Sequence, residues 1–175
     1  MDRAMIYIDN SNLFRTLREI DPNRNMDFAK LQEVLAAGRD LVATKLYASE
    51  KDPPVAAQSS FYRALQYMGI QVTLLKLKNY GGRLVEKGLD MALGLDMFAD
   101  AFRNHFDVAI LVAGDQDYVR LVTKVRSETG RKVELAFFGK AVSDELRRSA
   151  QRFHNFEPIF DSVTKIREGQ KEKDR

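Results

Sequence analysis

Aspartates occur at three separate places in the chain where they could act together on a metal ion. Asp9 begins the run 9–12, Asp90 follows a Lys-Gly-Leu turn, and Asp115 and Asp117 lie two residues apart. Four carboxylates brought close together repel one another, and shared protons or bound cations usually relieve that repulsion. Oxygen ligands without histidine or thiolate favour a hard cation. The pattern therefore predicts Mg²⁺ or Mn²⁺ as the cofactor.

Each of these acids also has a purely structural interpretation. Asp9 and Asp115 could be helix N-caps, and Asp90 could complement a helix dipole, each contributing about 1 kcal/mol or less. A further acid, Asp96, lies in a segment that is apolar nearly all round, which predicts a buried helix. Its carboxylate could be satisfied by a backbone amide or by a basic neighbour. Separate caps explain the acids singly better than they explain the whole set.

Several other chemistries are excluded or disfavoured by composition. The chain has no cysteine, which excludes disulfides, cysteine-ligated zinc, iron–sulfur clusters and thiol nucleophiles. Its two histidines, His105 and His154, do not lie beside a plausible ligand set, so zinc and a serine–histidine–acid triad are disfavoured. Neither of the glycine-rich phosphate-binding motifs occurs. Dinucleotide and P-loop nucleotide binding are therefore not supported.

The elements that must position these acids follow from the hydrophobic pattern. Short apolar, β-branched runs alternate with segments of helical period, which predicts parallel strands joined by crossover helices. Strands are expected at 4–8, 41–48, 71–76, 108–113 and 133–138, and helices at 12–20, 28–35, 55–68, 88–105, 117–129 and 143–151. Ligands of such sheets bind at the carboxyl ends of the strands, near the point where strand order reverses. We therefore expect three segments to meet at one crevice: 9–12, 86–90 and 114–117.

The remaining features set the boundaries of the fold. A chain of 175 residues, 45% hydrophobic and 30% charged, is typical of a single folded domain. We expect this domain over 1–160, a charged tail that is frayed or disordered over 161–175, and a hairpin turn or flexible loop at 79–82. No signal-peptide core and no apolar stretch of about 20 residues is found, so we expect a cytoplasmic protein without a membrane partner.

Three ordered motifs together resemble the NYN domain, the LabA-like branch of the PIN nuclease superfamily. They are 8–12 (Ile-Asp-Asn-Ser-Asn), 87–97 (Lys-Gly-Leu-Asp followed by Met-Ala-Leu-Gly-Leu-Asp-Met) and 111–118 (Leu-Val-Ala-Gly-Asp-Gln-Asp-Tyr). The resemblance covers roughly residues 5–156. It implies an α/β fold, a three-layer α/β/α sandwich with a central mainly parallel sheet, PIN-like and Rossmann-like. It also implies an acidic cleft that binds Mg²⁺ or Mn²⁺ and cuts RNA.

The resemblance assigns roles to individual residues. The metal-binding positions fall on four residues: Asp9, Asp90, Asp115 and Asp117. Asp96 matches a recurrent acidic position, and Asn12 would supply a neutral oxygen or orient a water, unless it is simply a polar residue of a first helical turn. Two positions depart from the pattern, Tyr118 where phenylalanine is common and Gln151 where aspartate is expected.

An acidic cleft repels RNA until cations fill it, so a nuclease also needs positive charge at the rim. Lys87 would neutralise phosphate or hold a carboxylate, and Tyr80 could stack on a base. The full set of expected substrate contacts is Lys76, Lys78, Tyr80, Arg83, Lys87, Arg120 and Lys124. The alternative is ordinary surface charge, which a net charge of +3 does not decide.

These observations favour a metal-dependent ribonuclease that hydrolyses phosphodiester bonds. Two alternatives stay open. One is a non-catalytic module that binds RNA or a protein on the same fold, and the other is a metal-dependent phosphatase or a nuclease acting on DNA or a small nucleotide. A homodimer is compatible with the sequence but is not indicated by it.

Overall fold

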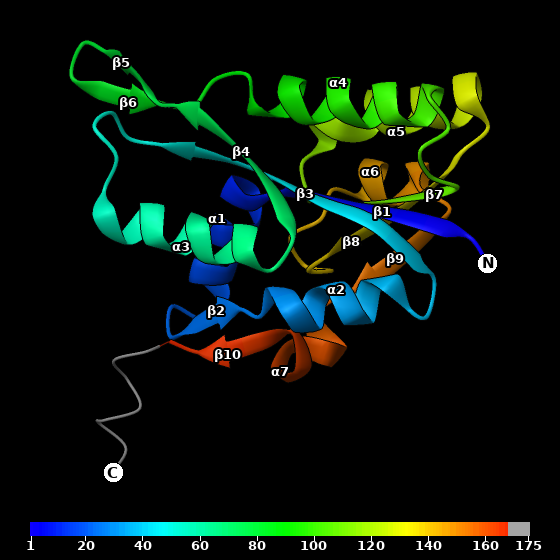
Figure 1. The fold of residues 1–175 in the computed structure, drawn as a ribbon, viewed down its shortest axis with the longest axis horizontal. Coiled ribbons are helices and arrows are strands. Elements are labelled where there is room, and N and C mark those ends of the chain that lie inside the picture. The colour runs from blue at the N-terminus through cyan, green and yellow to red at the C-terminus, as the bar shows by residue number, and fades with distance from the viewer. Residues whose placement is uncertain (168–175) are drawn as a thin grey trace.

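Six parallel strands form the centre of the molecule. The computed structural model describes residues 1–167 and orders these strands β4-β3-β1-β7-β8-β9 (Figure 1). The strands are β1 (Arg3–Asp9), β3 (Asp40–Glu50), β4 (Ile70–Lys76), β7 (Val108–Val112), β8 (Lys132–Phe137) and β9 (Arg152–Asn155). All five neighbouring pairs are parallel. The predicted α/β fold with a parallel sheet is confirmed.

Helices cover both faces of this sheet and make it the middle of three layers. They are α1 (Asn10–Ile20), α2 (Phe28–Ala36), α3 (Ala56–Tyr67), α4 (Leu89–Phe102), α5 (Val119–Thr129), α6 (Asp144–Ser149) and α7 (Phe160–Val163). Figure 1 shows α1, α2 and α3 on one side of the sheet, and α4 and α5 on the other.

Side chains that alternate along each strand form the two faces of the sheet. Ile6 and Ile8 of β1 pack in the core formed with α1, α2 and α3, whereas Met5 and Tyr7 pack in the core formed with α4, α5 and α6. Because successive side chains of a strand point to opposite faces, a strand covered on both sides needs a continuous apolar run. The run 4–8 is buried throughout and supplies apolar side chains to both cores.

Helix α4 differs from its prediction. Leu89, Leu93 and Met97 are buried against the sheet, but Met91 and Leu95 on the opposite side are each 63% exposed. The apolar residues all round this helix predicted complete burial, which is wrong because α4 forms the outer layer of the sandwich and only one of its faces meets the sheet.

Three short strands add to the predicted set. The polar edge strand β9 was not predicted, and β2 (Arg24–Met26) pairs antiparallel with β10 (Thr164–Ile166). Val163 is fully buried, so the packed domain continues past residue 160 into the expected tail. Residues 168–175 of that tail lie outside the described residues.

The segment around 79–82 is a hairpin. Strands β5 (Lys78–Tyr80) and β6 (Arg83–Val85) pair with each other and not with the central sheet, and Figure 1 shows them at one end of the molecule. Gly81 and Gly82 both have positive φ, which suits a tight hairpin turn. No helix within residues 1–167 has the length and apolar character required to cross a membrane.

Candidate active site

The site is built where the strand order reverses. From β1 the chain proceeds through β3 and β4 on one side of the sheet, whereas β7, β8 and β9 follow on the other side. Strands β1 and β7 are parallel neighbours, with Ile8 paired to Val112. Their carboxyl ends therefore bring Asp9 and the Gly114–Asp117 segment together, as open parallel sheets do at their ligand sites.

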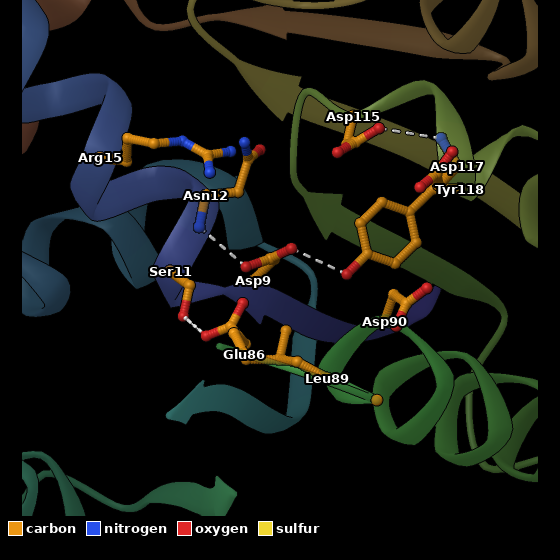
Figure 2. A pocket seen from close by; sticks show the side chains of 11 residues that line it. Asp9, Ser11, Asn12, Arg15, Glu86, Leu89, Asp90, Asp115, Asp117 and Tyr118 are labelled. Carbon is orange, nitrogen blue, oxygen red and sulfur yellow. Dashed lines mark hydrogen bonds between the residues drawn. The ribbon is translucent and has the colours of Figure 1, made fainter. Parts of the chain in front are cut away.

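Asp9 is the buried acid of this site. It ends β1, caps α1 and is only 7% exposed. Its Oδ1 accepts a hydrogen bond of 2.9 Å from the backbone N–H of Asn12, and its Oδ2 accepts one of 2.9 Å from the hydroxyl of Tyr118 (Figure 2). Burial raises the pKa of Asp9, whereas these two donors, together with the charge of Arg15, oppose that rise.

Asn12 joins the two central strands beyond their ends. Its Oδ1 accepts a hydrogen bond of 2.7 Å from the backbone N–H of Gly114. Gly114 has no room for a side chain, because an added Cβ would lie 2.5 Å from the Phe137 ring and 2.9 Å from the carbonyl oxygen of Ala141. The position therefore requires glycine for close packing, and that packing fixes the start of the following Asp115–Asp117 turn.

Asp115 and Asp117 are exposed acids of the short helix that follows β7. Asp115 caps the 3₁₀ turn η1 (Gln116–Tyr118), and its Oδ1 accepts a hydrogen bond of 3.1 Å from the backbone N–H of Asp117. The turn directs Tyr118 inward, where its side chain is 2% exposed. Burial, followed by the negative charges of Asp9, Asp90 and Asp115, raises the pKa of the Tyr118 hydroxyl.

The fourth predicted acid enters from the other side of the pocket. Gly88 adopts a left-handed conformation with φ of 85° and begins α4, so that Asp90 lies in the first turn of the helix. Glu86 precedes this turn and accepts a hydrogen bond of 2.5 Å from the hydroxyl of Ser11 in α1. The Ser11–Glu86 bond brings a fifth carboxylate to the same pocket.

These side chains line one cavity of about 250 Å³ (Figure 2). Its acids are Asp9, Glu86, Asp90, Asp115 and Asp117, and Arg15 is the cationic side chain beside them. Within residues 1–167, none of these five carboxylates forms a salt bridge, whereas acids elsewhere in the domain, such as Asp107 and Glu134, do. The pocket therefore concentrates negative charge that the single lining cation, Arg15, only partly offsets.

The chemistry of the lining groups fits a hard cation. The donors are carboxylate, hydroxyl and amide oxygens, and no histidine or sulfur ligand lines the pocket. Among the described residues, however, no three acidic or histidine side chains are gathered closely enough to hold one metal ion. The four predicted aspartates share a pocket without forming a compact ligand cluster. Three of them, Asp90, Asp115 and Asp117, are exposed, and exposed side chains change rotamer readily.

Other predicted site residues lie outside this cavity. Asp96 is exposed on α4 and accepts a hydrogen bond of 2.7 Å from the Tyr47 hydroxyl. Lys76 forms salt bridges with Glu50 at 2.9 Å and Asp52 at 3.9 Å. These contacts connect the two predicted residues to the scaffold of the domain.

The remaining predicted contacts are basic or aromatic residues on the surface. The ammonium of Lys87 lies 5.6 Å from the centre of the Tyr80 ring, which links the β5–β6 hairpin to the segment leading into the pocket. Lys124 pairs with Glu128 at 2.9 Å on α5. Three further side chains, Lys78, Arg83 and Arg120, are exposed.

The structure also gives a place in the pocket to three residues for which no role was predicted. Glu86, Ser11 and Arg15 line it. The sequence does indicate Glu86, because this acid lies four residues before Asp90, on the other side of the Lys-Gly-Leu turn. Ser11 and Arg15 lie on the helix that Asp9 caps, but only the fold shows that they face the acids.

The comparison with family models decides the classification. The model of the NYN domain matches residues 3–157. The chain belongs to the NYN family. This assignment places it in the PIN-like nuclease superfamily and confirms the resemblance found in the motifs, without specifying the LabA-like branch.

Solved structures include a similar chain, a protein of unknown function from Vibrio parahaemolyticus. It is 25% identical, has a TM-score of 0.80, and the alignment covers 94% of the present chain and 96% of the Vibrio chain. No curated protein sequence matches significantly. The NYN assignment thus supports a nuclease-type fold. Inferences about activity rest on the geometry of the pocket.

Proposed function

We propose that this NYN protein is a metal-dependent ribonuclease that hydrolyses RNA phosphodiester bonds in the acidic pocket. The observation that carries the proposal is the group of five carboxylates at the switch point of the sheet, none of which forms a salt bridge within residues 1–167. A group of carboxylates without salt-bridge partners favours cation binding. The membership of the family in a nuclease superfamily supports the same reaction class.

Each acid has a place in this proposal. Asp9, Asp90, Asp115 and Asp117 would hold Mg²⁺ or Mn²⁺, which supplies Lewis acidity to activate water and to stabilise negative charge on the phosphate. Asp9 would be the fixed ligand, because two hydrogen bonds already hold its carboxylate in place. Glu86 would accept a proton from the attacking water, since its carboxylate lies in the same pocket and is oriented by the Ser11 hydroxyl.

Basic and aromatic groups on one side of the pocket would guide the substrate. Lys78, Arg83 and Lys87 surround Tyr80 on the hairpin and on the segment that leads from it to Asp90. Cations of this kind contact phosphates, and an exposed tyrosine offers a face for base stacking. Arg120 at the start of α5 would extend this contact beyond Asp117.

The experiment is a cleavage assay with three classes of substrate. Purified protein is incubated with end-labelled single-stranded RNA, hairpin RNA and single-stranded DNA, and with a small chromogenic phosphoester, in Mg²⁺, Mn²⁺ or EDTA. The proposal predicts metal-dependent cleavage of RNA that EDTA abolishes. Salt-dependent binding of RNA without cleavage would instead support a non-catalytic RNA-binding module, and turnover of the small phosphoester alone would support a phosphatase.

A further inference from the structure

A second pocket lies on the other side of helix α1. Its lining from α1 comprises Asn10, Leu13, Phe14 and Leu17, whereas the acidic pocket is lined by Ser11, Asn12 and Arg15 of the same helix. Neighbouring residues of a helix point about 100° apart. The two pockets therefore open on roughly opposite sides of the first turns of α1, separated by the width of one helix.

The walls of the second pocket are aromatic. Phe14 of α1 is 53% exposed and Phe61 of α3 is 41% exposed, although both are large apolar side chains. Phe28 lies beneath them, with its ring centre 6.1 Å from that of Phe61. The cavity measures about 130 Å³, and a cavity of roughly 150 Å³ accommodates a single benzene ring. The space therefore suits one aromatic ring.

Two amide side chains give this apolar pocket its polar groups. Asn10 is 8% exposed, and Asn25 accepts a hydrogen bond of 2.5 Å from the guanidinium of Arg18. An asparagine amide offers both a donor and an acceptor, which is the combination that reads the hydrogen-bonding edge of a nucleobase. The oxygen of Asn25 already accepts from Arg18, so Asn25 offers a ligand its amide N–H groups as donors.

Positive charge lies between the two pockets. Arg15 lines the acidic pocket, and the guanidinium of Arg18 lies 4.7 Å from the centre of the Phe14 ring. Arg18 is held by the carbonyl oxygens of Pro22 and Arg24 as well as by Asn25. A nucleic-acid backbone that passes over α1 would therefore find two cations between the apolar pocket and the acids.

Given the ribonuclease activity proposed above, we propose that this second pocket binds one unpaired pyrimidine base of the RNA substrate. The base stacks against Phe14 and Phe61, and the amides of Asn10 and Asn25 contact its polar edge. A purine has a second ring that a cavity of about 130 Å³ does not enclose. The pocket thus selects a pyrimidine at a fixed distance from the cleaved bond.

The test uses binding and crosslinking, which do not depend on turnover. The full chain carrying Asp115→Asn is titrated with fluorescent oligouridine, oligocytidine and oligoadenosine of about eight nucleotides, a length within the usual site size. The same protein is irradiated with RNA containing 5-iodouridine, and the crosslinked peptide is identified by mass spectrometry. We expect tighter binding of both pyrimidine oligomers and a crosslink at Phe14 or Phe61.

Matched variants separate stacking from folding. Phe14→Ala should weaken pyrimidine binding roughly 10-fold, as loss of one base-stacking contact does. Phe14→Tyr keeps the aromatic face and should bind like the parent. Tyr67→Ala is the control, because Tyr67 is an exposed aromatic residue of α3 that does not line the pocket. This variant should bind pyrimidine oligomers like the parent.

The outcomes distinguish this inference from the proposed function. If the protein cuts RNA but Phe14→Ala behaves like Tyr67→Ala, or if the crosslink lies outside the pocket, the base-pocket inference is overturned while the ribonuclease proposal stands. A preference for oligoadenosine would overturn the selection of pyrimidine. If no RNA is bound at all, both proposals fail together.

Discussion

The side-chain oxygen of Asn12 lies 2.7 Å from the backbone nitrogen of Gly114 and accepts its hydrogen bond. This contact crosses 102 residues of sequence and joins the first turn of α1 to the segment that follows β7. It fixes the two segments that carry Asp9 and Asp115. Asn12 therefore positions the two acids through this hydrogen bond.

Asn12→Ala should cost about 1–3 kcal/mol in the free energy of unfolding, because it leaves the N–H of Gly114 without its partner. RNA cleavage should fall further than stability alone explains, since the spacing of the acids loosens. Urea unfolding and single-turnover cleavage check both effects. Asn23→Ala is the control, because Asn23 is exposed and its side chain makes no hydrogen bond within residues 1–167. Equal behaviour of the two variants would contradict the positioning role.

Gly114→Ala should destabilise the protein by about 1–3 kcal/mol, the usual cost of overpacking. The added methyl group would lie 2.5 Å from ring atoms of Phe137 and 2.9 Å from the carbonyl oxygen of Ala141, so these neighbours must shift. Gly94→Ala is a matched control inside α4, where the nearest atom is a Leu121 methyl at 3.7 Å. It should stabilise by roughly 0.5–1 kcal/mol. Thermal unfolding that ranks the two in the opposite order would refute this account of Gly114.

Tyr118→Phe should shift the acidic limb of the pH–rate profile to higher pH. The Tyr118 hydroxyl donates to Asp9 and stabilises its ionised form, so removing the donor adds to the rise in the pKa of Asp9 that burial already causes. Asp9 must be ionised to hold a cation, and activity is therefore lost from the acidic side. The maximum rate at high pH should be largely retained. An unchanged acidic limb would show that Asp9 does not control it.

Glu134→Gln tests a salt bridge remote from the site. Burial raises the pKa of Glu134, but hydrogen bonds from His154 and Arg39 outweigh it and hold that pKa at about 2, below its ordinary value of 4.5. The folded state thus favours the ionised acid. This stabilisation is fully present above pH 4.5 and is lost as pH falls toward 2.

The substitution should cost about 2 kcal/mol near pH 7, less than the ~3–5 kcal/mol of a fully buried pair, because both side chains keep some exposure. Urea unfolding at pH 7 and at pH 3 measures the difference, which should shrink at the lower pH. Glu128→Gln removes the exposed partner of Lys124 and should have little effect at either pH. A pH-independent difference would contradict the assignment.

Lys87→Gln should weaken RNA binding and flatten its dependence on salt. Each phosphate contact to single-stranded RNA contributes about 0.7 to the slope of log affinity against log salt. Lys30→Gln, on helix α2 and paired with Glu33, removes the same charge at a position outside the proposed substrate contacts. Fluorescence titrations at several salt concentrations compare the two. Equal salt slopes for the two variants would show that Lys87 makes no phosphate contact with the RNA.

Much of the fold could be predicted because its strands are continuous apolar runs. Strands β1, β7 and β8 are buried on both faces, so each carries the β-branched and apolar pattern that identifies it. Strand β9 was missed because it is a polar edge strand that packs mainly through the half-buried Phe153. The exposed face of α4 was also missed, since apolar residues occupy both its buried and its outer side.

The candidate site was predictable only where an acid follows a strand or begins a helix. Asp9, Asp90 and Asp115 satisfy that rule and share one pocket in the structure. Glu86 lies in a segment expected at the crevice, but the orientation of its carboxylate depends on its bond to Ser11, which lies 75 residues away, and no local pattern encodes such a contact. The pairing of Lys76 with Glu50 is equally tertiary, because it depends on the register of β3 beside β4.

The most direct test of the central claim compares matched acids in a metal-dependent cleavage assay. Asp90→Asn and Asp115→Asn remove pocket carboxylates from two different segments, and Glu19→Gln removes an exposed acid of α1 that does not line the pocket. Single-turnover rates on RNA are measured across a Mn²⁺ titration, and circular dichroism verifies folding. We predict losses of about 100-fold or more for both aspartate variants, and a rate like the parent for Glu19→Gln. Cleavage that survives in folded Asp90→Asn and Asp115→Asn would contradict catalysis in the acidic pocket.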